Sequence, residues 1–272
     1  MKIDIIILNT AKAERVVRNA EFLLEQKTDF PFQIFVVDNS ENPTQIALLT
    51  KAFFHHPQVR LFLCPNTFGY PHGNNWGVKQ GNGEYIAIVN PDIFCHETDT
   101  LQKMSTFLDK NSDVGIVGPK QQNEDGSYPF TVRKFPNLFV QIARRSFLRY
   151  FPGIRKAVAA DEMHDMGREK RQEVDWIQSS FLLIRRSLWE EIGGFDERYF
   201  LFMSDAELCQ EAWRRGKKVM YFPHTTVTAD GKRCSEGGFL RLFSKWTLRQ
   251  HVRDALRYWW RHRNENNPRE EM

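Results

Sequence analysis

The sequence predicts an α/β protein with a single, mostly parallel sheet flanked by helices and a basic helix at its carboxyl end. Short apolar runs alternate with segments of helical spacing over residues 1–120, which is the order of a parallel sheet covered on both faces. The runs show no alternation with polar residues, as is typical of strands buried on both faces. The chain has 272 residues, 41% of them hydrophobic, and is therefore long enough for one large core.

Strands and helices alternate in this first part of the chain. The expected strands are Ile3–Asn9, Phe32–Val37, Val59–Cys64, Tyr85–Val89 and Val114–Val117. The expected helices are Ala11–Gln26, Thr44–Phe54 and Thr98–Leu108, the second of which is opened by Asn42 and Pro43.

The pattern loosens after Gly118. A turn is expected at Asn123–Ser127 and a helix at Phe139–Phe151, and a charged, weakly apolar loop follows over Ala157–Glu173. The later expected elements are a strand at Phe181–Ile184, a helix at Leu188–Ile192 closed by Gly193 and Gly194, a helix at Asp205–Arg215 and a strand at Val219–Phe222 ended by Pro223.

Composition argues against several classes of protein. The formal net charge of +4 is too small to indicate a nucleic-acid partner. The four cysteines form no CxxC pair, which argues against a zinc or redox site and fits a reducing cytoplasm. The charged start Met1–Asp4 does not resemble a signal peptide, and no run approaches the ~20 apolar residues of a membrane-spanning helix. We expect a cytoplasmic protein, either free or peripheral on the inner face of the cytoplasmic membrane.

Asp92 follows directly on the expected strand Tyr85–Val89, which Asn90 and Pro91 bring to an end. A carboxylate is thus placed at the carboxyl end of a central strand, where open α/β sheets bind their ligands. Mg²⁺ and Mn²⁺ prefer such oxygen ligands and are often held by one or two carboxylates together with substrate phosphates. The alternative is that Asn90–Asp92 is only a strand-ending turn.

Asp205 and Glu207 form a second acidic pair at the start of an expected helix. Ser204 and Glu207 have the spacing of a capping box, which would give Glu207 a purely structural role. That interpretation leaves Asp205 unexplained. In the first turn the helix dipole favours an ionised carboxylate, which is the form that a general base needs.

Two further segments have the composition of a ligand site. Asp38 ends the strand Phe32–Val37 and can accept a hydrogen bond from a base or ribose, or it can simply form a turn with Asn39 and Ser40. Residues 66–75 are rich in glycine and asparagine and precede helical sequence, so that free N–H groups there can approach a phosphate. The segment lacks both the GxGxxG and the P-loop patterns, and a plain glycine-rich turn remains the alternative.

Taken in order, these segments resemble a family 2 glycosyltransferase of the GT-A fold, with its Rossmann-like sheet, and in particular the bacterial rhamnosyltransferase-like group. The resemblance covers about residues 3–235 and rests on segments that are weak singly and specific together. They are Val36–Ser40, Asn66–Tyr70 with Gly73–Asn75, Asn90–Asp92, Gly193–Glu197 and Ser204–Cys209.

The resemblance implies a role for each matching residue. Asp205 would be the catalytic base, Asp92 the metal ligand and Asp38 a contact of the nucleotide base. The other donor-binding residues would be Asn9, Asn66, Gly69, Asn74, Asn75, Asn90 and Arg233. The acceptor side would include Trp176, Gln178, Ser179 and Glu207.

Three positions depart from the family pattern. Ser204 stands where a glutamate is usual, and Asn9-Thr10-Ala11 where a Tyr-Asn pair is common. Ala229 stands where a histidine often binds metal or diphosphate, so a site for Mg²⁺ or Mn²⁺ would lack that ligand.

The carboxyl-terminal segment, residues 239–272, is expected to extend a catalytic domain of residues 1–238 with a helix from Phe239 to Arg263. Basic residues recur every four positions and form one ridge: Arg241, Lys245, Arg249, Arg253, Arg257 and Arg261. Tryptophans beside this ridge suit an anionic membrane surface. The alternatives are a helix docked on the catalytic domain with a solvated basic face, or one side of a homodimer.

The resemblance implies an inverting transfer of a hexose such as rhamnose, from a dTDP- or UDP-sugar to a glycan or lipid-linked acceptor, in cell-surface polysaccharide synthesis. The alternative is a non-catalytic relative that binds a nucleotide or glycan and scaffolds a membrane-associated assembly, which Ser204 and Ala229 favour slightly. A sugar nucleotidyltransferase would want a glycine- and arginine-rich loop after the first strand, and residues 9–13 contain no glycine.

Overall fold

The computed structural model describes residues 2–65, 69–145, 147–230 and 246–272. The strands are β1 Ile3–Asn9, β2 Phe32–Asp38, β3 Val59–Leu63, β4 Tyr85–Val89, β5 Ile93–Phe94, β6 Val114–Asn123, β7 Val132–Arg133, β8 Gln172–Glu173, β9 Trp176–Ile177, β10 Phe181–Arg185 and β11 Lys218–Ala229. The helices are α1 Ala13–Leu24, α2 Pro43–Phe53, α3 Tyr70–Val78, α4 Thr100–Lys110, α5 Leu138–Arg145, the 3-10 helix η1 Phe147–Tyr150, α6 Pro152–Asp161, α7 Arg186–Ile192, α8 Ser204–Arg214 and α9 Trp246–His262.

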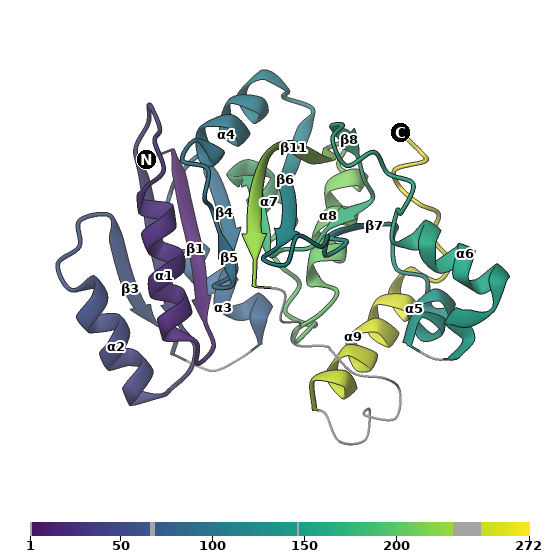
Figure 1. Ribbon diagram of the computed structural model, residues 1–272, viewed down its shortest axis with the longest axis horizontal. Coiled ribbons are helices and arrows are strands. Elements are labelled where there is room, and N and C mark those ends of the chain that lie inside the picture. Colours follow the sequence, from purple (N-terminus) through teal and green to yellow (C-terminus); the bar gives the residue numbers. More distant parts are fainter. Residues whose placement is uncertain (1, 66–68, 146, 231–245) are drawn as a thin grey trace.

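The main sheet has the strand order β3-β2-β1-β4-β10-β6-β11-β5, with β8 added beside β11 (Figure 1). Strands β3, β2, β1 and β4 are mutually parallel, as predicted from their apolar runs. Strand β10 is antiparallel to both of its neighbours, β4 and β6. The sheet is therefore mostly parallel, and its one antiparallel central strand begins at the edge where β4 ends.

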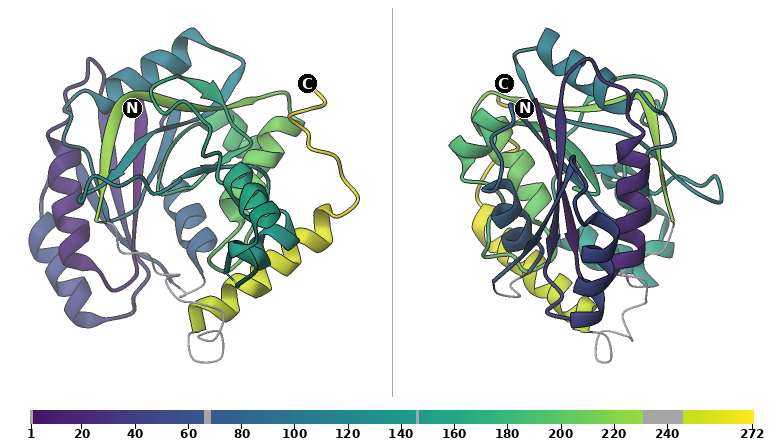
Figure 2. Two further views of the ribbon diagram at one scale, coloured as in Figure 1. Left: turned by 45° about the vertical axis from the view of Figure 1, so that its right-hand side comes forward. Right: turned by 90° about the vertical axis from the view of Figure 1, so that its left-hand side faces the viewer.

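Two apolar layers hold helices against the two faces of the sheet, and the views in Figure 2 show the sheet between them. Side chains of β1 alternate between the layers: Ile5 and Ile7 pack with α1, α2 and α4, and Ile6 and Leu8 with α3, α7, α8 and α9. All seven residues of β1 are buried, which explains why the sequence there shows no polar alternation.

The predicted elements of the first half are confirmed, although β6 continues to Asn123, beyond the expected end at Val117, and later elements depart in three places. The helix expected over Phe139–Phe151 is divided into α5, which ends at Arg145, and the 3-10 helix η1. The segment expected to be a loop over Ala157–Glu173 begins inside α6 and ends in β8. The strand expected to stop at Pro223 continues to Ala229, because a register shift between Phe222 and Thr226 takes the proline out of the ladder. The predicted closure of α7 is confirmed, since Gly193 adopts a left-handed conformation with φ 90°.

Helix α9 is fixed to the rest of the molecule by two buried acids. Asp254 on α9 is fully buried and accepts hydrogen bonds from the backbone N–H groups of residues 200, 201 and 202, at 3.3, 3.1 and 3.0 Å. Glu207 on α8 meets the imidazole of His262 at 2.7 Å and the guanidinium of Arg261 at 3.2 Å. The loop that leads into α8 is therefore held in place by the last helix of the chain.

The basic ridge expected along the carboxyl-terminal helix is divided among different surroundings. Arg249 is exposed, Arg253 and Arg257 line a pocket, and Arg261 joins the ion pairs with Glu207 and Asp196. The expected start of this helix, residues 239–245, falls in a part of the chain that the structure does not describe. No helix in the described ranges is both long and apolar enough to cross a bilayer.

Candidate active site

The carboxyl ends of β1 and β2 place two polar side chains together. Asn9 and Asp38 are partners in the parallel register, and the Asn9 amide donates to the Asp38 carboxylate at 2.6 Å. The Asn9 side-chain oxygen accepts from the backbone N–H of Lys12 at 2.7 Å, which fixes the entry to α1. The Ser40 hydroxyl lies within hydrogen-bond distance of both Asp38 oxygens, at 2.9 and 3.0 Å. Both residues are buried, so Asn9 acts first to orient Asp38.

Asn90 and Asp92 form a tight turn at the end of β4. The backbone N–H of Ile93 donates to the Asn90 carbonyl at 3.1 Å, and the N–H of Asn90 donates to the Ser180 carbonyl at 2.8 Å. The second bond exists because β10 runs antiparallel to β4 and starts beside its end. The turn therefore joins Asp92 to the 178–180 segment, which the sequence had placed at the acceptor.

Asp205 lies in the first turn of α8, beside the same segment. Its carboxylate accepts from the backbone N–H of Ser179 at 3.3 Å and from its neighbour Ala206 at 3.0 Å. Burial raises the pKa of Asp205 to about 6, although the backbone N–H groups of Ser179 and Ala206 oppose the shift. Burial therefore outweighs the helix dipole expected to favour the ionised form, although a carboxylate with this pKa is still mostly ionised at neutral pH. A pKa near neutrality is well suited to a general base.

Tyr70, the first residue of α3, connects the two acids. Its hydroxyl lies 3.1 Å from the Asn90 side-chain oxygen and 3.0 Å from the Ser179 carbonyl. Burial raises the Tyr70 pKa, and the negative charges of Asp205 and Asp92 raise it further, so the hydroxyl stays protonated. Asp92 and Asp205 are thus close enough to act on one phenol, and they border the same region. Sequence reasoning included Tyr70 in a motif without assigning it a role.

Asp92 is surrounded by charged groups from α1 and the end of β11. Burial raises its pKa, Asp230 raises it further, and Lys12 and Arg15 lower it. The backbone N–H of Asp230 donates to the Asp92 carbonyl at 3.2 Å, and the Asp230 carboxylate pairs with Arg15 at 2.7 Å. Ala229, aligned with the usual histidine, pairs with Ile93 in β5.

A divalent cation fits this arrangement in part. The described residues contain no group of three or more acidic, histidine or cysteine side chains that would hold a metal by themselves. Asp92 and Asp230 nevertheless bring two carboxylates to one strand end, and Mg²⁺ usually takes only one or two protein carboxylates and completes its shell with substrate phosphates and water. The site therefore suits an ion that arrives with a diphosphate.

Three of the residues expected to bind the donor lie at the start of α3 and make contacts that shape it. Gly69 lies so close to the 200 segment that a Cβ would come within 2.1 Å of the Phe200 carbonyl oxygen. Asn74 is buried and donates to the Tyr70 carbonyl at 2.9 Å. The Asn75 amide bridges the carbonyl of Phe195 and the carboxylate of Glu197, both at 2.8 Å. The contacts of Gly69 and Asn75 join the start of α3 to the segment that leads to Asp205, and the Asn74 bond lies within α3.

The residues expected on the acceptor side divide between the site and the core. Ser179 contacts Asp205, and Gln178 beside it is partly buried. Trp176 is buried, and its indole N–H donates to the Lys134 carbonyl at 2.7 Å. Glu207 accepts from the Tyr199 hydroxyl at 2.9 Å and pairs with α9, so its carboxylate faces a helix and not open space.

The capping box expected from Ser204 and Glu207 is absent. Helix α8 is capped by Met203, which adopts a left-handed conformation and makes no side-chain capping bond. The remaining expected contacts, Asn66 and Arg233, belong to segments that the structure does not describe.

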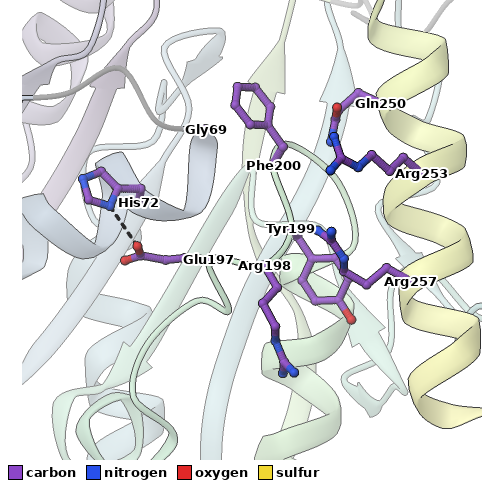
Figure 3. Close-up of a pocket in the computed structure, with 9 residues that line it drawn as sticks. All are labelled: Gly69, His72, Glu197, Arg198, Tyr199, Phe200, Gln250, Arg253 and Arg257. Atoms are coloured by element: carbon purple, nitrogen blue, oxygen red, sulfur yellow. Dashed lines mark hydrogen bonds and ion pairs between the residues drawn. The ribbon is translucent and has the colours of Figure 1, made fainter.

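A pocket of about 370 Å³ opens next to this site, between the start of α3, the 197–200 segment and α9 (Figure 3). It is lined by Gly69, His72, Glu197, Arg198, Tyr199, Phe200, Gln250, Arg253 and Arg257. The residues that end β1, β2 and β4 are absent from this lining. The pocket and the acids share Tyr70 as a link, because its backbone N–H donates to the Phe200 carbonyl at 2.8 Å.

Comparison with known proteins gives one family and several relatives. The model of the family described as "Glycosyl transferase family 2" matches residues 4–192. Rhamnosyltransferase WbbL of Escherichia coli (strain K12) is 25% identical over 237 residues, covering 85% of this chain and 83% of its own. The N-acetylglucosaminyl-diphospho-decaprenol L-rhamnosyltransferase of Mycobacterium tuberculosis (strain ATCC 25618 / H37Rv) is 25% identical over 216 residues, covering 75% and 68%.

Solved structures agree on the fold. The mannosyltransferase PcManGT from Pyrobaculum calidifontis, in complex with GDP-Man and Mn²⁺, superposes with a TM-score of 0.66 at 14% identity, over 99% of this chain and 68% of its own. GalNAc-T7 with UDP, GalNAc and Mn²⁺ gives the same TM-score at 13% identity, and the match covers 96% of this chain and 49% of that chain.

Proposed function

The chain belongs to glycosyltransferase family 2 and has the GT-A fold, and from that premise we propose that it transfers a hexosyl group, rhamnosyl first among the candidates, with inversion at the anomeric carbon. The donor would be a dTDP- or UDP-sugar, and the acceptor a glycan or lipid-linked sugar of the cell surface. The relatives support the sugar and the acceptor through their names, as a rhamnosyltransferase and as a diphospho-decaprenol rhamnosyltransferase.

One observation carries the proposal: Asp205 on α8, with a pKa of about 6, and Asp92 at the end of β4 both act electrostatically on Tyr70, whose hydroxyl contacts Asn90 and Ser179 beside them. Asp205 would take the proton of the acceptor hydroxyl. The acceptor oxygen would then form a bond to the anomeric carbon from the face opposite the nucleotide. The bond from that carbon to the diphosphate oxygen would break, and the nucleoside diphosphate would leave with the electron pair.

Other residues would bind the donor without taking part in proton transfer. Asp38, oriented by Asn9, would accept a hydrogen bond from the nucleotide base or ribose. Asp92, with Asp230 beside it, would hold a Mg²⁺ or Mn²⁺ ion that neutralises charge on the diphosphate when bound. Lys12 and Arg15 add positive charge at the same strand end. Asn90 would keep Tyr70 in place between the two acids.

The proposal is tested by incubating the purified protein with dTDP-rhamnose and a panel of UDP-hexoses, with Mn²⁺, Mg²⁺ or a chelator. A short alkyl glycoside would serve as a water-soluble acceptor. We expect transfer with one donor, and proton NMR of early product should show the anomeric configuration opposite to that of the donor. A product of retained configuration would refute the assignment of Asp205 as base, and absence of transfer or donor hydrolysis throughout would refute the donor class.

A further inference from the structure

We propose that the pocket between α3, the 197–200 segment and α9 binds the phosphate or diphosphate group of a lipid-linked acceptor. The inference rests on the proposed transfer and adds where the acceptor's anionic group would lie. The pocket opens beside the site of the acids, and no residue that ends β1, β2 or β4 lines it. A second, separate anion can therefore be held there while the donor diphosphate occupies the strand ends.

Two arginines of α9 give the pocket positive charge, and a third arginine of the lining, Arg198, is paired with Asp196. Arg253 and Arg257 lie one turn apart on α9 and extend toward the 197–200 segment in Figure 3. Within the described chain neither guanidinium has an acidic partner, and like charges at this spacing destabilise a helix. Glu197, the carboxylate in the lining, contacts His72 at 2.8 Å and accepts a hydrogen bond from Asn75. Two arginines in a concave site, with no acidic partner among the described residues, suit a phosphate, which guanidinium groups bind bidentately.

The position of the pocket relates it to the acceptor. The 197–200 segment forms one wall and runs directly into α8, whose second residue is Asp205. Tyr70 connects the pocket wall to the segment beside Asp205, because its backbone N–H donates to the Phe200 carbonyl and its hydroxyl donates to the Ser179 carbonyl. A molecule held at Arg253 and Arg257 would therefore lie beside the segment that leads to Asp205.

The outer face of α9 supports a lipid source for the phosphate. Trp246, Leu256 and Trp260 are 51%, 46% and 64% exposed and lie on the same helix as the pocket arginines. Tryptophan and arginine side by side on one helix face suit the interface of an anionic membrane. An acceptor anchored in that membrane would carry its phosphate to the depth of the pocket.

The test compares Arg253→Gln/Arg257→Gln with Arg249→Gln, an exposed arginine of the same helix that does not line the pocket. Two acceptors carry the same sugar, one on geranyl diphosphate and one on a neutral geranyl chain. We expect the double variant to raise KM for the diphosphate acceptor about 10- to 100-fold, as loss of two charge-assisted contacts implies. KM for the donor and for the neutral acceptor should stay within twofold, and Arg249→Gln should match the native protein.

Each contrary result has a distinct meaning. If KM rises equally for both acceptors, or for neither, the pocket does not bind the acceptor phosphate, and the transferase assignment is unaffected. If the native protein transfers to neither acceptor, the proposed function fails. Calorimetry then tests the pocket separately, because a diphosphate site should bind geranyl diphosphate more tightly than geraniol. Binding to phosphatidylglycerol vesicles that depends on Arg253 and Arg257, without binding of geranyl diphosphate, would show a membrane headgroup as the ligand and overturn the acceptor assignment.

Discussion

Replacing Asp205 with asparagine tests the chemistry and the electrostatics of the site together. The change keeps the shape of the side chain and removes its charge. With a pKa of about 6, the carboxylate is roughly 30-fold more ionised than protonated at pH 7.5. A general base contributes about 10²- to 10⁴-fold to a rate. We expect transfer to fall by that factor, while donor binding stays unchanged.

The same substitution should leave the fold at least as stable as before. Raising a carboxyl pKa from 3.8 to about 6 costs the folded state about 3 kcal/mol at neutral pH. Asparagine avoids that cost but can accept from only one of the two N–H groups, Ser179 or Ala206, and loss of one such bond costs about 1–3 kcal/mol. The net change in unfolding free energy should therefore lie between about 0 and +2 kcal/mol.

Three measurements check this reasoning. Transfer rates give the loss of activity, urea denaturation at pH 7.5 and pH 4.5 gives the stability, and kcat/KM of the native protein against pH should show an acid limb near pH 6. The advantage of the variant should shrink at pH 4.5, because the folded native protein is then protonated at this position. Glu211→Gln, the same change of charge two turns along α8, is the control and should stay active. Activity of Asp205→Asn within tenfold of native, or a stability loss of several kcal/mol, would refute the argument.

Three further predictions concern the supports of the site. Asp254→Asn keeps one side-chain oxygen and so leaves one or two of these three backbone N–H donors without an acceptor; unfolding free energy should fall by about 1–6 kcal/mol in urea titrations, and unchanged stability would contradict the buried contact. Burial lowers the His262 pKa, but Glu207 and Glu265 raise it more, so the stability that protonated His262 contributes is complete below pH 6.5 and is lost as pH rises through the raised pKa. The melting temperature should therefore fall more steeply from pH 6 to 9 in the native protein than in His262→Gln, and parallel slopes would refute this. Gly69→Ala should cost about 1–3 kcal/mol and most of the activity, because its Cβ meets a backbone oxygen, and a fully active variant would show that the 200 segment moves freely.

Much of the fold was predictable because its strands are formed by short, continuous apolar runs that can be recognised from the local sequence alone. The runs that form β1, β2 and β4 are buried on both faces, and their apolar sequences predicted this directly. The direction of β10 was not predictable, because its partners β4 and β6 lie far away in the chain. That direction matters, since it brings Ser179 to the end of β4.

The site was predictable in its residue types and less so in its electrostatics. The sequence located Asp92 and Asp205 through strand-end and helix-start patterns. It could not show that burial would raise the Asp205 pKa, which depends on segments packed from elsewhere. Glu207 had the right spacing for a cap, yet its partners come from α9, more than fifty positions away. A pattern confined to four residues cannot reveal such a partner.

The buried carboxylate of Asp254 has a practical consequence for anyone who shortens this chain. The family match ends at residue 192, and the sequence motifs alone predict a catalytic domain that ends at residue 238. A protein truncated at either point would lose the carboxylate that ties down residues 200–202, as well as the His262 and Arg261 partners of Glu207. Affinity tags and fusion partners are therefore better placed at the amino terminus, and the smallest working enzyme should extend through α9.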